Sequence, residues 1–123
     1  MESIIENLCR EQGTLIHIKK NTLLFRSVYR METPYIYYLV DGVCALGGSS
    51  YQGQEQVLLY FMPGSLIGIN QFLDGFGSNL HAYSTPSGMT KTDCTLYRIP
   101  ASAALDLLET SLEFNQYVIK TLS

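Results

Sequence analysis

Few side chains in this sequence have the types and spacing that catalysis or metal binding requires. Its three cysteines, Cys9, Cys44 and Cys94, are widely spaced and form no Cys-x-x-Cys pair, which predicts buried free thiols rather than a zinc site or a disulfide framework. Two histidines, His17 and His81, are too few for a metal centre built from several converging ligands. No nucleophile has a neighbouring histidine base. We therefore predict no metal, no cofactor, no catalytic residue and no enzymatic activity.

The composition is that of one packed globular domain. The chain has 123 residues, of which 46% are hydrophobic and 15% are charged, and this balance excludes a disordered protein. The formal net charge is −3, whereas a protein that binds duplex DNA usually carries a basic stripe. The nearest approach to a basic cluster, between Lys19 and Arg30, is flanked by Glu11 and Glu32. This segment alone is not expected to bind DNA.

The sequence predicts a cytoplasmic protein without a membrane partner. The longest apolar run, from Val57 to Met62, has the length of a strand and is far too short to span a bilayer. The acidic, amphipathic N-terminus, MESIIENLCREQ, is unlike a secretory signal.

Frequent glycine and proline signals divide the chain into short elements. Residues 2–12 have the spacing of an amphipathic helix that Gly13 can end. Asp41-Gly42 is a hairpin signal, residues 47–50 form a predicted loop, and residues 86–88 are predicted to separate the last two strands. A short helical corner is expected over 70–73 and a loop over 74–79. The predicted strands are 14–18, 23–27, 35–40, 43–47, 54–62, 80–85 and 92–99. This pattern favours a sandwich or roll.

The periodicity changes to helical after Pro100, which suits a helix start. A first helix is predicted over 101–108. The segment from Thr110 to Glu113 reads as a capping box with Thr110 as the cap, so a second helix should begin near Ser111.

The second helix carries the spacing of a coiled-coil seam with one polar position. The seam residues, separated by three, four and three positions, are Leu112, Asn115, Ile119 and Leu122. This pattern predicts a homodimer, and the alternative is an ordinary helix that packs on the core of its own domain. Because the heptad pattern has barely begun at Ser123, we expect that the natural chain continues.

Several short motifs follow one another along almost the whole chain. They are Tyr38-Leu39-Val40-Asp41-Gly42, Gly53-x-Glu55, Leu58-x-Tyr60, Gly64-x-x-Ile67-Gly68, Thr92-x-Cys94 and Leu96-Tyr97-Arg98-Ile99. In order and spacing they resemble the sensory domain of the Crp/Fnr family of bacterial transcription regulators. The resemblance implies a mainly β fold with flanking helices, a double-stranded β-roll or jelly roll of the cyclic-nucleotide-binding type. The implied division is an effector-sensing roll over 1–109 and the start of a dimerisation helix over 110–123.

The resemblance also implies a function. Ligand binding in the roll would reposition the dimerisation helix and so control a helix-turn-helix domain that reads the operator. DNA would be bound only through that further domain, which this sequence does not contain. The alternative is a stand-alone module for small-molecule binding or protein interaction, which the natural reading frame beyond Ser123 would distinguish.

Two residues that hold the nucleotide in cyclic-nucleotide-binding members are replaced here. Ile69 takes the place of the glutamate that holds the ribose, and Ser84, followed by Thr85, takes the place of the arginine that holds the phosphate. Loss of one charge-assisted hydrogen bond costs about 1.5–3 kcal/mol. No arginine lies between Arg30 and Arg98 to substitute. The sequence therefore predicts weak or no binding of cyclic AMP and cyclic GMP.

The family geometry would place a set of neutral side chains around one effector pocket. These candidate residues are Gly68, Ile69, Asn70, Gln71, Phe72, Tyr83, Ser84 and Thr85. Their mixture of apolar walls and uncharged hydrogen-bonding groups suits a small, weakly polar or aromatic metabolite. The alternative is a collapsed pocket that side chains fill, since loss of the arginine removes a reason to keep the space open.

Overall fold

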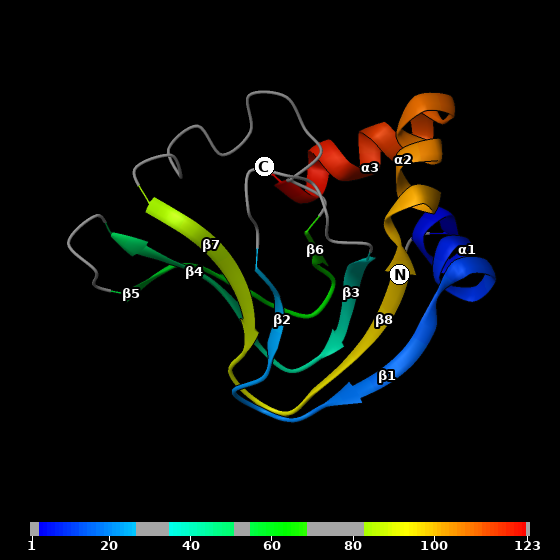
Figure 1. The fold of residues 1–123 in the computed structure, drawn as a ribbon. Helices are drawn as coiled ribbons and strands as arrows, with labels where there is room; N and C mark the ends of the chain where they lie inside the picture. The colour runs from blue at the N-terminus through cyan, green and yellow to red at the C-terminus, as the bar shows by residue number, and fades with distance from the viewer. Residues whose placement is uncertain (1–2, 27–34, 51–54, 69–82, 123) are drawn as a thin grey trace.

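Two four-stranded antiparallel sheets face each other in the described part of the chain, which a computed structural model gives as residues 3–26, 35–50, 55–68 and 83–122 (Figure 1). One sheet has the order β1-β8-β3-β6, and the other has the order β2-β7-β4-β5. The elements are α1 (Ser3–Gln12), β1 (Thr14–Ile18), β2 (Leu23–Arg26), β3 (Tyr35–Asp41), β4 (Cys44–Ser50), β5 (Glu55–Phe61), β6 (Leu66–Ile67), β7 (Tyr83–Thr90), β8 (Cys94–Pro100), α2 (Ala101–Thr110) and α3 (Leu112–Leu122). This arrangement confirms the predicted mainly β roll with flanking helices.

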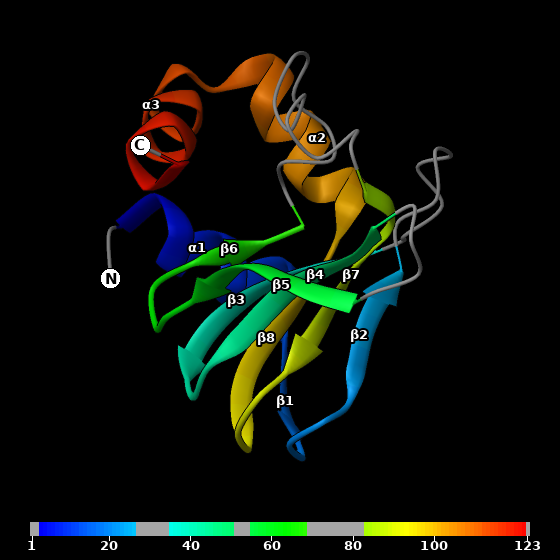
Figure 2. The same cartoon turned by 90° about the vertical axis from the view of Figure 1, so that its left-hand side faces the viewer.

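The first sheet is covered on both of its faces. Its outer face carries the helices, as Figure 2 shows, and its inner face meets the second sheet. Alternation along β3 explains this arrangement, because Ile36 and Tyr38 face outward whereas Tyr37 and Leu39 face inward. Each face of this strand is therefore apolar, as the sequence of 35–40 predicts for a strand covered on both sides.

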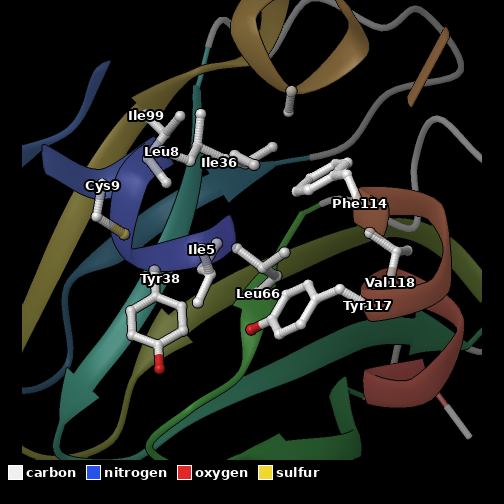
Figure 3. Packing of buried hydrophobic residues seen from close by; sticks show 11 residues of the cluster. Ile5, Leu8, Cys9, Ile36, Tyr38, Leu66, Ile99, Phe114, Tyr117 and Val118 are labelled. Atoms are coloured by element: carbon white, nitrogen blue, oxygen red, sulfur yellow. The ribbon is translucent and has the colours of Figure 1, made fainter. Parts of the chain in front are cut away.

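Two hydrophobic cores result from this alternation. The outer core, which lies between the first sheet and the helices, consists of Ile5, Leu8, Cys9, Ile36, Tyr38, Leu66, Ile99, Ala104, Phe114, Tyr117 and Val118 (Figure 3). The inner core, which lies between the sheets, consists of Tyr37, Leu39, Cys44, Leu46, Ile67, Cys94 and Leu96. Strands β3, β6 and β8 contribute to both cores. The same three strands therefore carry side chains of the outer core on one face and side chains of the inner core on the other.

The helices contribute to the outer core by apolar residues at helical spacing. In α1 the buried residues Ile5, Leu8 and Cys9 are three and four positions apart, and the backbone N–H of Gly13 donates to the Cys9 carbonyl at 2.9 Å where the helix ends. In α3 the same spacing places Phe114, Tyr117 and Val118 against the sheet. The predicted helix over 2–12 is confirmed.

The turn at Asp41-Gly42 was predicted as a hairpin, and this prediction is wrong. The turn lies where expected and Gly42 has a positive φ of 101°. However, β3 pairs with β8 and β6, whereas β4 pairs with β5 and β7. The turn therefore carries the chain from one sheet to the other, and β6 and β8, which are distant in sequence, pair with the two edges of β3.

Two segments predicted as loops are strand. Residues 47–50 continue β4, because hydrogen-bonded partners on both sides outweigh the poor strand preference of glycine and serine. The segment 86–88 lies inside β7 and does not end it. Pro86 is accommodated because the β4–β7 register shifts between Gly47 and Ser49, where a bulge removes the need for its missing N–H.

The predicted cap of the last helix lies one residue later than expected. The helix start near Ser111 is confirmed, but its cap is Ser111, whose Oγ accepts from the Phe114 N–H at 3.1 Å. Thr110 is still the last residue of α2, and its hydroxyl donates to the Asp106 carbonyl one turn back, at 2.7 Å. Ser111 has the extended backbone of a capping residue, which Thr110 cannot adopt while it remains helical.

A buried threonine holds the turn between β1 and β2. Thr90 is fully buried; its hydroxyl donates to the Lys19 carbonyl at 2.7 Å and accepts from the Thr22 N–H at 2.9 Å. Asn21, in this turn, has a positive φ of 64°. Thr90 carries no sequence signal for this role.

Gly42 is expected to tolerate no side chain. A Cβ there would lie 2.6 Å from the Asp93 carbonyl oxygen and 2.6 Å from the Cys94 sulfur, in addition to the cost of its positive φ. Gly64 is a matched control, because it has a similar φ of 97° and a Cβ added there would meet nothing within 4 Å. Gly42→Ala should lower the free energy of unfolding by about 3 kcal/mol and Gly64→Ala by about 1 kcal/mol in urea titrations. Equal losses would contradict this packing.

Stability should fall above pH 9 because of two buried thiols. Burial raises the pKa of Cys9 to about 11, and burial with the neighbouring Cys94 raises the pKa of Cys44 to about 12, from an ordinary value of 9.0. Between the ordinary thiol pKa of 9.0 and the raised pKa of each buried thiol, the unfolded chain loses a proton that the folded chain keeps. This contribution to stability is therefore full below pH 9 and decreases above it. Each thiol should contribute at most about 1.4 kcal/mol per pH unit. In urea titrations at pH 8 and pH 10, Cys44→Ala should show a smaller decrease than the wild type, and an identical decrease would contradict the assignment.

Candidate functional site

The predicted effector residues that the structure describes lie in different sheets. Gly68 is buried just beyond β6, in the first sheet, with a positive φ of 96°. Tyr83, Ser84 and Thr85 begin β7 in the second sheet, where Ser84 is opposite Ser49 of β4. Ile69, Asn70, Gln71 and Phe72 lie outside the described residues. That these residues line one pocket therefore stays a prediction.

The inner face of the first sheet carries a charge that the sequence interpretation missed. Arg98 lies on β8 two residues after Leu96 and directly opposite Tyr37 of β3. Its guanidinium carbon is 4.8 Å from the centre of the Tyr35 ring, a cation–π contact of about 1 kcal/mol. Tyr35, Tyr37 and Leu96 belong to the inner core or pack against it. Arg98, a partly buried residue, therefore lies on the apolar inner face, near the end of the roll where β3 begins.

Tyr37 connects this face to the opposite sheet. Its hydroxyl donates to the Leu24 carbonyl of β2 at 3.4 Å. Burial raises the pKa of Tyr37, the positive charge of Arg98 opposes this change, and Tyr35 adds to it. The phenol therefore remains protonated at neutral pH and serves as a hydrogen-bond donor between the sheets.

The sequence does not show whether the Arg98 side chain lies on the inner or the outer face of the first sheet. Its inward side follows from strand alternation with Cys94 and Leu96, but Tyr97 and Ile99 on the other face are equally apolar. Periodicity alone cannot decide which face of such a strand lies inside the roll. The register with β3 decides it.

The cysteines are confirmed as buried free thiols, and two of them lie in contact. The sulfur atoms of Cys44 and Cys94 are 3.7 Å apart across the inner core, and Cys94 also donates to the Thr92 carbonyl at 3.3 Å. Cys9 lies in the separate outer core. Within the described ranges, no three His, Cys, Asp or Glu side chains gather as a metal site would require. The raised pKa of Cys44 keeps its thiol protonated, which suits packing rather than nucleophilic chemistry.

Only one of the two histidines, His17, lies within the described residues. His17 lies on β1, where its Nδ1 is 3.1 Å from the Thr95 hydroxyl at the surface. His81 lies outside the described residues.

The predicted dimerisation residues lie along α3. Leu112 and Ile119 are 74% and 68% exposed, on the side of the helix opposite the buried Phe114 and Val118. The Asn115 amide donates to the carbonyls of Leu108 and Ser111 at 2.7 and 2.8 Å, which fixes the corner between α2 and α3.

Leu122 is the last residue of α3. The helix therefore uses one face for its own domain, and it also presents exposed apolar side chains. None of the helices described here is long and apolar enough to cross a bilayer.

Known proteins resemble this chain in sequence pattern and in fold. The family model of the cyclic nucleotide-binding domain matches residues 15–111. The sensor domain of the transcriptional regulator DNR from Pseudomonas aeruginosa is 17% identical, with a TM-score of 0.66 over 96% of this chain and 73% of that one. Among curated proteins, none matches the sequence significantly.

Two longer regulators have the same fold over one part of their chains. The Thermus thermophilus catabolite activator protein is 16% identical, with a TM-score of 0.69 over 99% of this chain and 54% of that one. A transcriptional regulator of the Crp/Fnr family from Eubacterium rectale is 14% identical, with a TM-score of 0.74 over 99% of this chain and 54% of that one. This chain thus spans about half the length of these two regulators. Together with the family match over most of its length, these observations show that the chain belongs to the cyclic nucleotide-binding domain family, with the fold of Crp/Fnr sensory domains.

Proposed function

We propose that this chain is the effector-sensing part of a Crp/Fnr-type transcription regulator, that it acts as a homodimer, and that its effector is neither cyclic AMP nor cyclic GMP. The observation that carries the proposal is the double role of α3. One side of the helix closes the outer core through Phe114, and the other side exposes Leu112 and Ile119. In the proposed dimer, a helix placed in this way would connect the outer core to the second copy of the chain.

The proposed signal passes through β3 and β8. These strands place alternate residues in the inner and outer cores, so a ligand that moves Tyr37 or Leu96 also moves the backbone that carries Ile36 and Ile99. Packed cores resist continuous deformation, so such a change favours a discrete shift of the helix that rests on them. The shift would change the position of α3 relative to its partner in the dimer.

The proposed DNA-reading domain lies elsewhere in a longer protein. A net charge of −3 gives this chain little attraction for duplex DNA. This chain matches only about half the length of two regulators with the same fold. This partial match supports the proposal that a separate domain binds the operator. A regulatory rather than catalytic role is part of the same proposal, and the protonated Cys44 thiol is in agreement with it.

The homodimer should depend on the exposed face of α3. Leu112 and Ile119 are seven residues apart, so both can enter one helix–helix seam. Leu112→Glu with Ile119→Glu should weaken self-association more than tenfold in sedimentation equilibrium, since each buried charge costs well over about 1.4 kcal/mol. Leu15→Glu, at an apolar residue of β1 that is 50% exposed, is the matched control and should leave association unchanged. A wild-type monomer at high concentration, or a dimer that survives the double change, would contradict the proposal.

Cyclic nucleotides should produce no calorimetric signal at millimolar concentration. The reason is the neutral Ser84 on β7, which supplies no charge to a phosphodiester. The double change Ile69→Glu and Ser84→Arg, which restores both nucleotide-holding residues of the family, should raise the affinity for cyclic AMP about tenfold or more. Binding of cyclic AMP to the wild type with a dissociation constant of a millimolar or less would refute this part of the proposal.

A further inference from the structure

Arg98 is a charged side chain in an apolar setting. The lysines and arginines with described side chains are Arg10, Lys19, Lys20, Lys91, Arg98 and Lys120, and all of them except Arg98 are exposed. Arg98 shares the inner face of the first sheet with Tyr37 and Leu96, two buried members of the inner core. Its position is therefore unlike that of an ordinary surface cation.

A charged residue that is partly buried among apolar side chains is stabilised by a compensating partner. Within the described ranges, no carboxylate forms an ion pair with Arg98; its guanidinium lies over the ring of Tyr35, and its positive charge opposes the rise of the Tyr37 pKa. The nearby Tyr37 hydroxyl donates to the Leu24 carbonyl and remains protonated, so it carries no negative charge. The described surroundings supply aromatic contact but no counter-charge.

The contact with Tyr35 also directs how a ligand would bind. The guanidinium carbon lies over the Tyr35 ring, 4.8 Å from its centre. The N–H donors of a guanidinium lie along its edge. Donors arranged in this way match the two oxygens of a carboxylate, which accept two parallel hydrogen bonds. A single positive charge balances a single negative one, and the partly buried ring of Tyr35 offers a surface for an aromatic body.

We propose that Arg98 is the anion-binding residue of the roll and that the effector is a small aromatic monocarboxylate. This inference rests on the proposed sensory function and names the ligand class of that site. It assigns the charge to β8 of the first sheet, whereas Ser84 on β7 of the second sheet stands where nucleotide-binding members have their arginine.

Benzoate is the probe and benzamide is its neutral control of the same shape. In thermal-shift and calorimetric titrations of the chain, benzoate should raise the unfolding midpoint with concentration and benzamide should not. Arg98→Gln should weaken benzoate binding about tenfold or more, and Arg98→Lys should weaken it less because the charge remains. Tyr35→Leu should also weaken binding. Arg10→Gln, which removes an exposed guanidinium on α1, is the matched control and should bind benzoate as the wild type does.

Two results would overturn the inference. One is a wild-type protein that benzoate stabilises no more than benzamide does, and the other is an Arg98→Gln variant that binds benzoate with unchanged affinity. Should Arg98→Gln fail to fold, as judged by circular dichroism, the comparison of Arg98→Lys with Arg10→Gln decides the question, and equal affinities for benzoate would overturn the inference.

The same experiments separate this inference from the proposed function. If benzoate binds through Arg98 but leaves the dimerisation constant unchanged, the anion site stands and the sensory function fails. If no carboxylate binds while a neutral compound shifts the dimerisation constant, the sensory function stands and the role of Arg98 fails.

Discussion

The pairing of β3 with β8 is the constraint on which the rest of the structure depends. Because these strands lie side by side in the sheet that is covered on both faces, every successive residue must suit one core or the other. The helices satisfy the outer face through residues such as Phe114, and the second sheet satisfies the inner face through residues such as Leu46. Neither face can be repacked without moving the backbone of the other, which is why the proposed signal from a ligand to α3 passes through this pair of strands.

The sequence predicted those parts of the fold that depend on interactions between residues close together in the chain. The helix that ends at Gly13, the strand that begins at Tyr35 and the helix start after Pro100 all follow from short-range patterns, and all are confirmed. The strand at 47–50 and the passage of β7 through Pro86 were missed because they depend on partners distant in sequence. Pairing with strands on both sides outweighs the weak strand preference of glycine, and a bulge accommodates proline. Neither effect can be predicted from the sequence of the segment itself.

The candidate site was predictable to a similar extent. The family resemblance implies that Ser84 replaces the nucleotide-holding arginine, and on that basis the sequence predicts what the roll should not bind. The inward side of Arg98 is not plain, because Tyr97 and Ile99 make both faces of β8 apolar and only the register with β3 tells them apart. The neutral Ser84 on one sheet and the charged Arg98 on the other are the two residues on which the proposed preference for an anion other than a cyclic phosphodiester rests.

Amide hydrogen exchange along α3, measured with and without saturating benzoate, tests the central claim most directly. If the inner face and the helix share β3 and β8 as described, the ligand should slow exchange at Phe114, Tyr117 and Val118 as well as in the two strands. Slower exchange confined to β3 and β8, with α3 unchanged, would contradict the claim that the two cores act together.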